Sequence, residues 1–209
     1  MTEPATYKTL RTTGESVVEI KRSVFYGFAA PVTTEASALE FIAQIKAKYP
    51  DAKHHVYAYS LREGHTTRYS DDREPQGTAG MPVLDVLRKN DCVDAIIVVV
   101  RYFGGTLLGT GGLVRAYTAA ATEALQNASP ARRMRRRLFL LHLPYNDYRK
   151  AVNSLFSEEG YYVHDTVFGE RVDVKISVPY NQADSLIRCC ADMSAGRISC
   201  EELEEFYGF

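Results

Sequence analysis

The sequence predicts an α+β protein of two-layer α/β type that folds as two domains, and three observations lead to this prediction. The first half of the chain alternates strand-like and helix-like segments around the apolar run AIIVVV at 95–100. The second half follows the order strand, helix, strand, strand, helix, strand. Between the halves, Pro130 ends a helical pattern and arginines cluster. We therefore expect one domain at 1–131 and another at 136–209.

The spacing of apolar residues predicts the elements of the first half. The inward helix faces are expected to contain Leu39, Ile42, Ile45 and Tyr49 in the first helix, and Leu113, Tyr117, Ala120 and Ala124 in the last. A polar loop between them is longer than an ordinary connection, and long loops of this kind are often functional. In order, we expect a strand pair at 15–32, a helix at 35–49, a strand at 54–61, the polar loop at 62–80, a short helix at 81–90, a strand at 93–103 and a helix at 112–128.

The second half shows clearer periodicity. Strict alternation predicts one buried strand face formed by Val172, Val174, Ile176 and Val178. The expected elements are a strand at 136–145, a helix at 146–160, strands at 161–168 and 171–178, a helix at 181–196 and a strand at 197–209. The inward helix faces are Tyr148, Val152, Leu155 and Phe156, then Ala183, Leu186, Ile187, Cys190 and Met193. This βαββαβ order is the ferredoxin-like arrangement.

Composition favours a cytoplasmic protein with reduced cysteines. The 209 residues carry a net charge of −1, so any affinity for nucleic acid must come from a local basic patch. The four cysteines form no CxxC pair, and the five histidines are not spaced as zinc ligands beside them. The start of the sequence lacks the apolar core of a signal peptide, and no run approaches about 18 apolar residues. We expect no membrane contact, no metal and no cofactor.

The glycine-rich stretch RYFGGTLLGTGGLVRA lies at 101–116. It is not a P-loop, because Thr110 stands where the phosphate-binding lysine belongs. It is not a dinucleotide loop, because Val114 replaces the third glycine. Two interpretations stay open: the glycines serve a sharp turn, or their amides hold an anion at the helix start between two arginines. The candidate residues for binding an anion or a nucleic acid are Arg101, Tyr102, Gly104, Gly105, Gly109, Thr110, Gly111, Gly112 and Arg115.

A second segment with glycines, DDREPQGTAGMP, lies at 71–82. Asp71, Asp72 and Glu74 could bind Mg²⁺, or Glu74 could act as a general base. The same acids could equally be solvated, since no histidine or serine stands at a diagnostic interval. The glycines open a helix and could form a second concave group of amides. The candidate residues of this second loop are Glu74, Gly77, Thr78, Ala79 and Gly80.

The basic linker RRMRRR at 132–137 contains Arg132, Arg133, Arg135, Arg136 and Arg137. These arginines could bind phosphates. They could equally be a solvated linker, or a strand start that pairs with the acidic segment EELEEF at 201–206 if the first and last strands of the second domain are neighbours. An RNA-recognition motif is excluded, because its third strand needs aromatic residues for base stacking and 171–178 has none.

Taken together, DDREPQGTAGMPVLDVL and IIVVVRYFGGTLLGTGGLVRAY resemble the signature of the IMPACT (YigZ-type) family, in a bacterial two-domain member. The resemblance implies a first domain of the ribosomal protein S5 domain 2-like fold, which small-molecule GHMP kinases and a domain of elongation factor G share. It implies that the second domain resembles another, ferredoxin-like domain of that translocase. Eukaryotic relatives control translation through an extra scaffold-binding domain, which is missing here, so their mechanism is not transferred.

The residues and the resemblance support three hypotheses on function. The first is a non-enzymatic cytoplasmic factor that binds RNA or the ribosome and acts in translation regulation. The second is a phosphate- or nucleotide-binding enzyme that uses the glycine-rich loop at 104–112. The third is a protein–protein adaptor. The sequence assigns no catalytic residue, and the first hypothesis is preferred because basic sites accompany the implied pair of folds.

Overall fold

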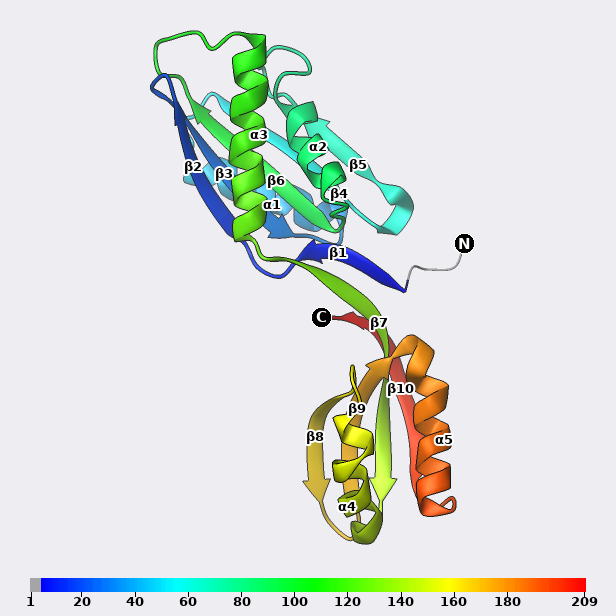
Figure 1. The fold of residues 1–209 in the computed structure, drawn as a ribbon. Coiled ribbons are helices and arrows are strands. Elements are labelled where there is room, and N and C mark those ends of the chain that lie inside the picture. Colours follow the sequence, from blue (N-terminus) through cyan, green and yellow to red (C-terminus); the bar gives the residue numbers. More distant parts are fainter. Residues whose placement is uncertain (1–4) are drawn as a thin grey trace. The chain divides into compact units, whose positions relative to one another are not determined.

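The computed structural model describes residues 5–209 and divides into two compact units (Figure 1). The N-terminal unit is Tyr7–Arg132. The C-terminal unit is Arg133–Phe209 together with the described residues that precede Tyr7. Strand β7 (Pro130–Leu143) carries the chain from one unit into the other. Within residues 5–209, no helix is both long and apolar enough to span a bilayer.

The N-terminal unit contains a five-stranded antiparallel sheet of order β2-β3-β6-β4-β5. Its central strand β6 (Ala95–Tyr102) is buried along nearly its whole length, as its branched apolar residues predict. Alternate residues of β6 enter two cores, with Ile97 and Val99 on one face and Ile96 and Val98 on the other. The other strands are β2 (Gly14–Ile20), β3 (Ser23–Pro31), β4 (His54–Ser60) and β5 (Thr67–Ser70).

Helices cover both faces of this sheet (Figure 1). Helix α1 (Glu35–Lys48) packs on one face, and its start carries a capping box between Thr34 and Ser37. Helices α2 (Gly80–Lys89) and α3 (Thr110–Asn127) pack on the other face. Helix α3 begins two residues before its predicted start. Its four predicted inward residues are all buried.

Two predictions for the N-terminal unit need correction. In α1, Ile42 and Ile45 are buried, but Leu39 is 53% exposed and the smaller Ala38 faces the sheet instead. The segment 62–80, predicted as a loop, contains a 3₁₀ turn (Glu63–His65) and the edge strand β5. The four polar and partly exposed residues of β5 lack a hydrophobic pattern, and their pairing with β4 makes them a strand.

The C-terminal unit confirms the predicted ferredoxin-like order. Its antiparallel strands lie in the order β10-β7-β9-β8, so the first and last strands of the motif are neighbours. Helices α4 and α5 cover one face of the sheet (Figure 1). The elements are β7, α4 (Tyr145–Asn153), β8 (Tyr162–Phe168), β9 (Val172–Pro179), α5 (Ala183–Ser194) and β10 (Ser199–Gly208), with short 3₁₀ turns at Leu155–Ser157 and Tyr180–Gln182. Strand β1 (Thr6–Leu10) precedes them in the chain.

The core of the C-terminal unit lies between the helices and β9. All four predicted residues of the β9 face are fully buried. In the helices the prediction is only partly correct, because Val152 and Ile187 are each 40% exposed while Ala151 is buried. The segment predicted as one helix at 146–160 ends as an α-helix at Asn153 and is followed by the 3₁₀ turn Leu155–Ser157.

Candidate functional site

A buried ion pair holds the end of β6 against the loop that precedes α2. Arg101 Nη1 lies 2.6 Å from Glu74 Oε1, and both side chains are at least nine-tenths buried. The hydroxyl of Tyr117 on α3 donates a hydrogen bond of 2.8 Å to the same carboxylate oxygen. Burial and the Glu74 charge raise the pKa of Tyr117, which stays protonated and donating. Because both groups are engaged inside the fold, Arg101 is not an exposed phosphate contact and Glu74 is not a free base.

In the second predicted loop, a carboxylate of the loop itself occupies the amides at the helix start. The carboxylate of Asp71 accepts hydrogen bonds from the amides of Gly77, Ala79 and Gly80, at 2.9, 3.1 and 2.7 Å. The Thr78 amide donates to Pro75 O. We call residues 77–80 with Asp71 the α2 start. Its amides were expected to be available to a ligand, and this expectation is corrected, since a carboxylate already fills them.

The three acids of this loop have separate partners, not a shared one. Asp71 binds the α2 amides, and Glu74 binds Arg101. Asp72 accepts the His55 amide at 2.7 Å. Within the described chain, these contacts leave no common point at which the three carboxylates face one cation.

The start of α3 has a different structure. Gly109, with a φ of 73°, precedes the helix, and within the described chain no side chain caps it and its first turn contains no acid. The Leu113 amide bonds Gly109 O, which leaves the amides of Thr110, Gly111 and Gly112 without an acceptor inside the helix. Three N–H groups therefore point outward at the positive end of the helix dipole.

The glycines at 104–112 are required by the fold for different reasons, and one of them is not required by it. Gly104 is required by packing, because a Cβ there would lie 2.0 Å from the Arg22 carbonyl carbon. Gly109 is required by its positive φ. Gly111 is required by neither, since only Arg115 Nη1 would lie within 4 Å of its Cβ, at 3.6 Å. The fold therefore does not explain this glycine, and its missing side chain leaves the amides open.

Two exposed arginines adjoin these amides. Arg115 projects back along α3 toward Gly111. Arg22, in the turn between β2 and β3, reaches Thr106 Oγ1 at 3.4 Å. Arg22 is far from this loop in sequence and was not predicted to belong to the site. We call residues 104–115 with Arg22 the α3 start. Two predicted members do not belong to it, because Arg101 is buried in its ion pair with Glu74 and Tyr102 packs against the α1-side core. The members that it retains are Gly104, Gly105, Gly109, Thr110, Gly111, Gly112 and Arg115.

The predicted basic linker is part of strand β7, and its charges are divided. Arg135 pairs with Glu205, and Arg137 pairs with Glu202, both on β10. The register of β7 and β10 brings these residues together, so the predicted pairing of basic and acidic segments is found and a continuous phosphate-binding run is not. Of the other three arginines, Arg132 is exposed, Arg133 lies over the Phe209 ring, and Arg136 points to the opposite face of the sheet.

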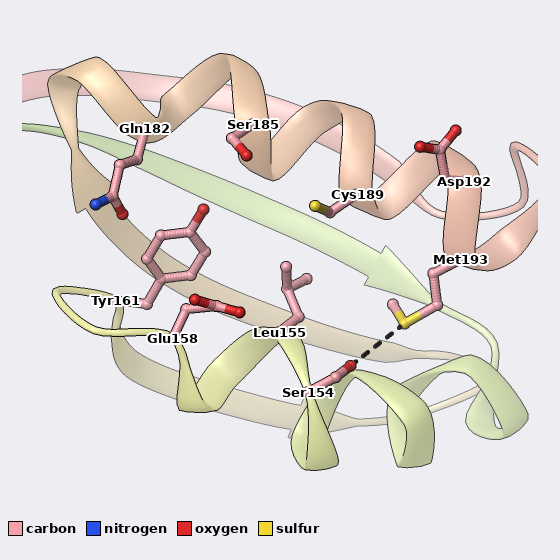
Figure 2. A pocket seen from close by; sticks show the side chains of 9 residues that line it. All are labelled: Ser154, Leu155, Glu158, Tyr161, Gln182, Ser185, Cys189, Asp192 and Met193. Carbon is pink, nitrogen blue, oxygen red and sulfur yellow. Dashed lines mark hydrogen bonds between the residues drawn. The ribbon is translucent and has the colours of Figure 1, made fainter.

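A separate cavity of about 600 Å³ lies in the C-terminal unit, between α5 and the segment 154–161 that follows α4. Figure 2 shows Glu158 and Asp192 at this cavity, together with Tyr161 and Cys189. The nine residues that line it include no lysine or arginine. Its two acids make it unsuited to a polyanion.

Comparisons with known proteins agree with this architecture. The family model described as the Impact N-terminal domain matches residues 21–125. Over 202 residues, the chain is 33% identical to the IMPACT family member YvyE of Bacillus subtilis, covering 96% of this chain and 93% of that protein. It is 31% identical to the IMPACT family member YigZ of Escherichia coli over 192 residues, covering 90% and 94%. A Protein IMPACT homolog of Dictyostelium discoideum is 38% identical over 101 residues, which are 46% of this chain and 29% of that protein.

The fold has a solved counterpart. A crystal structure described as that of a hypothetical protein superposes with a TM-score of 0.62 at 28% sequence identity. The superposition covers 97% of this chain and 99% of that chain. Both units of the present structure therefore fall within the similarity.

Proposed function

This chain belongs to the IMPACT family, and we propose that it is a non-enzymatic factor that binds single-stranded RNA at the α3 start and acts in translation. The role in translation follows from the family resemblance and from the domain folds it implies. The choice of the α3 start rests on one observation. Among the described residues, the amides of Thr110, Gly111 and Gly112 have no acceptor, two exposed guanidinium groups lie beside them, and the first helical turn contains no acid.

These groups match the chemistry of a phosphodiester. Amides at a helix start donate hydrogen bonds to phosphate oxygens, and the helix dipole favours the negative charge. Arg22 and Arg115 can each add a charge-assisted hydrogen bond to the same or a neighbouring phosphate. Of the two glycine-rich helix starts, only the α3 start has amides free for a phosphate, because Asp71 occupies those of the α2 start.

Exposed apolar side chains beside the α3 start favour RNA over a free phosphate. Phe103 is 54% exposed and lies with its ring 5.6 Å from the Arg101 guanidinium carbon. Leu107, within the loop, is 83% exposed. An aromatic ring of this kind can stack an unpaired base, which is a common contribution to binding single strands.

The second hypothesis, a nucleotide-using enzyme, has weaker support. The cavity next to α3, of about 300 Å³, lies between α2 and α3 and is lined by residues such as Val114, Thr118 and Thr122. None of its lining residues comes from 104–112. Exposed residues of the α3 start include Gly105, Leu107, Gly109, Thr110 and Gly111. An exposed site of this kind suits an extended polymer better than a small molecule that must be enclosed.

Fluorescence anisotropy with a labelled twelve-nucleotide oligouridylate tests the proposal. Measured between 50 and 200 mM KCl, the affinity should fall as salt rises, with a slope of about −0.7 for each phosphate contact. Arg115→Gln should weaken binding about fivefold or more at low salt and reduce the slope by about 0.7.

Arg68→Gln is the matched control for this experiment. Arg68 is an exposed arginine on β5, at the opposite edge of the sheet from β2. Its replacement should leave the affinity within about twofold of the native value, as for surface changes away from a site. The proposal fails if RNA does not bind at 50 mM KCl, or if both arginine variants weaken binding equally.

A further inference from the structure

Arg136 is a buried arginine, and no acidic side chain in residues 5–209 pairs with it. Its side chain lies on the face of the C-terminal sheet opposite the helices and is only 7% exposed as a residue. Its Nε donates to Ser177 Oγ at 3.0 Å, and its Nη2 donates to the carbonyl oxygens of Gly160 and Ser177 at 2.7 and 2.8 Å. All three acceptors are neutral, and Nη1 makes no hydrogen bond within the described chain.

The neighbours of Arg136 show how unusual this is. Arg135 and Arg137 each pair with a glutamate of β10, and these contacts raise the pKa of both guanidinium groups. Burial alone lowers the pKa of Arg136. A buried charge that lacks an opposite charge costs free energy, and an incoming anion would recover part of that cost. Among the described residues, Arg136 is therefore a buried positive charge that no acidic side chain matches, on the sheet face opposite the helices.

Aromatic rings surround this charge. Arg136 lies in a hollow of about 350 Å³, whose lining includes Gly160, Tyr162, His164, Ser177 and Phe206. The Tyr162 and His164 rings meet edge to face at 4.8 Å, and His164 and Phe206 at 6.4 Å. Tyr162 is 61% exposed, so one ring face is available to a ligand. Ligand sites commonly occupy about 300–1,000 Å³ and combine apolar walls with a few fixed polar groups.

Gly208 makes room for this arrangement. A Cβ at this position would lie 3.0 Å from Arg136 Cδ and 3.0 Å from Phe206 Cε2. The strand end of β10 can therefore lie close against the stem of Arg136 while the guanidinium remains at the hollow.

We propose that this hollow binds one nucleotide, with its phosphate on Arg136 and its base against the ring of Tyr162. A guanidinium recognises phosphate through charge-assisted hydrogen bonds, and an exposed aromatic ring stacks a base of any sequence. The rings at this hollow lie on strands β8 and β10, not on β9, which contains no aromatic residue. The site lies wholly within the C-terminal unit, so it does not depend on the α3 start.

The nucleotide could be free or part of an RNA strand, and the experiment separates the two sources. Full-length protein is titrated with 5′-UMP and separately with a hexauridylate, while amide NMR resonances of Gly160, Tyr162 and Ser177 are followed. Saturable shifts of these resonances with 5′-UMP are expected if the free nucleotide suffices. Shifts with the hexauridylate alone assign the site to RNA and still support the proposal.

Two variants and one control complete the design. Arg136→Gln should weaken binding about tenfold or more through the lost charged contact. Tyr162→Ala, at an exposed position, should weaken it about fivefold or more through lost stacking without depending on the stability of the core. Arg135→Gln, on the same strand but the opposite sheet face, should leave the affinity within about twofold.

Three results would overturn the proposal. Uridine binding as tightly as 5′-UMP would remove the phosphate contact. Benzoate producing the same shifts as tightly as 5′-UMP would indicate a site for carboxylates, such as a peptide terminus, instead of a nucleotide. Unchanged affinity of both ligands for Arg136→Gln would remove the residue from the site. If Arg115→Gln has no effect on RNA while Arg136→Gln does, the proposed function at the α3 start fails and this inference stands.

Discussion

The α2 start and the α3 start are both helix starts preceded by glycines, yet only the first carries its own anion. Asp71 places its carboxylate on three amides of the α2 start. At the α3 start, within the described chain, no side chain does the same, and arginines lie at the surface instead. A glycine run before a helix therefore indicates backbone amides that face outward. Whether a ligand can bind these amides depends on another residue, such as Asp71, which lies six to nine positions before the amides that it bonds.

The largest effect should come from Glu74, the third acid of the loop before α2. Glu74→Gln removes the charge that compensates buried Arg101, and breaking such a pair costs about 3–5 kcal/mol. Equilibrium urea denaturation should show this loss for the N-terminal unit. Glu40→Gln, an exposed change on α1, should stay within about 0.5 kcal/mol of the native protein. If Glu74→Gln lowers the free energy of unfolding no more than the control does, the Glu74–Arg101 ion pair does not stabilise the fold.

A smaller effect is expected when the α2 start loses its anion. Asp71→Ala leaves three amides without an acceptor, and should destabilise the protein by about 2 kcal/mol. The variant α2 start then resembles the α3 start, so added sulfate should raise the melting temperature of Asp71→Ala more than that of the native chain. Equal sulfate effects on both proteins would show that Asp71 does not occupy an anion site.

The reverse change supplies the α3 start with an anion. Gly111→Asp adds a carboxylate in the first turn and should stabilise the helix by about 1 kcal/mol, since glycine is a poor helix former and the dipole favours the charge. The same variant should bind RNA about tenfold more weakly. Gly111→Ala should gain similar stability and lose RNA affinity by a smaller factor, because its Cβ covers the amides without adding charge. RNA affinity unchanged in both variants would contradict the proposed site.

The smallest expected effect is a change in how stability depends on pH, and it concerns the start of α4 in the C-terminal unit. Asp147, in the first turn of α4, receives two hydrogen bonds from Arg197, and these lower the pKa of its carboxyl group. Because the folded pKa lies below the unfolded value of about 3.9, the stabilisation is present above that pH and is lost as the pH falls through the folded pKa. Thermal unfolding at pH 6 and pH 3 should show a smaller pH difference for Asp147→Asn than for the native chain. An identical difference would show that this ion pair does not contribute.

Local patterns predicted most of the fold, because helices and strands follow from periodicity within one segment. They failed where distant residues decide. Strand β5 exists through its pairing with β4, and on α4 the small Ala151 is buried where the periodicity favoured Val152. The burial of Arg101 needed Glu74 and Tyr117, which meet it only in the folded chain.

The candidate sites show the same division. The glycines and Arg115 of the α3 start were visible in the sequence, whereas Arg22 joins them from another hairpin. The sequence contains a reason why Arg136 lacks the acidic partners of Arg135 and Arg137. Successive residues of a strand point to opposite faces of the sheet, so Arg136 points away from its two neighbours. Alternation gives this result only when all three arginines are assigned to one strand, whereas the predicted strand began at Arg136 and left Arg135 in the linker.

Amide resonances at the two helix starts provide the most direct test of the account. In a titration of the full-length protein with the twelve-nucleotide oligouridylate, the amides of Thr110, Gly111 and Gly112 should shift in a saturable way. The amides of Gly77, Ala79 and Gly80, already bonded to Asp71, should remain unchanged. Shifts at the α2 start, or none at the α3 start while RNA binds, would contradict the claim that the open helix start is the RNA site.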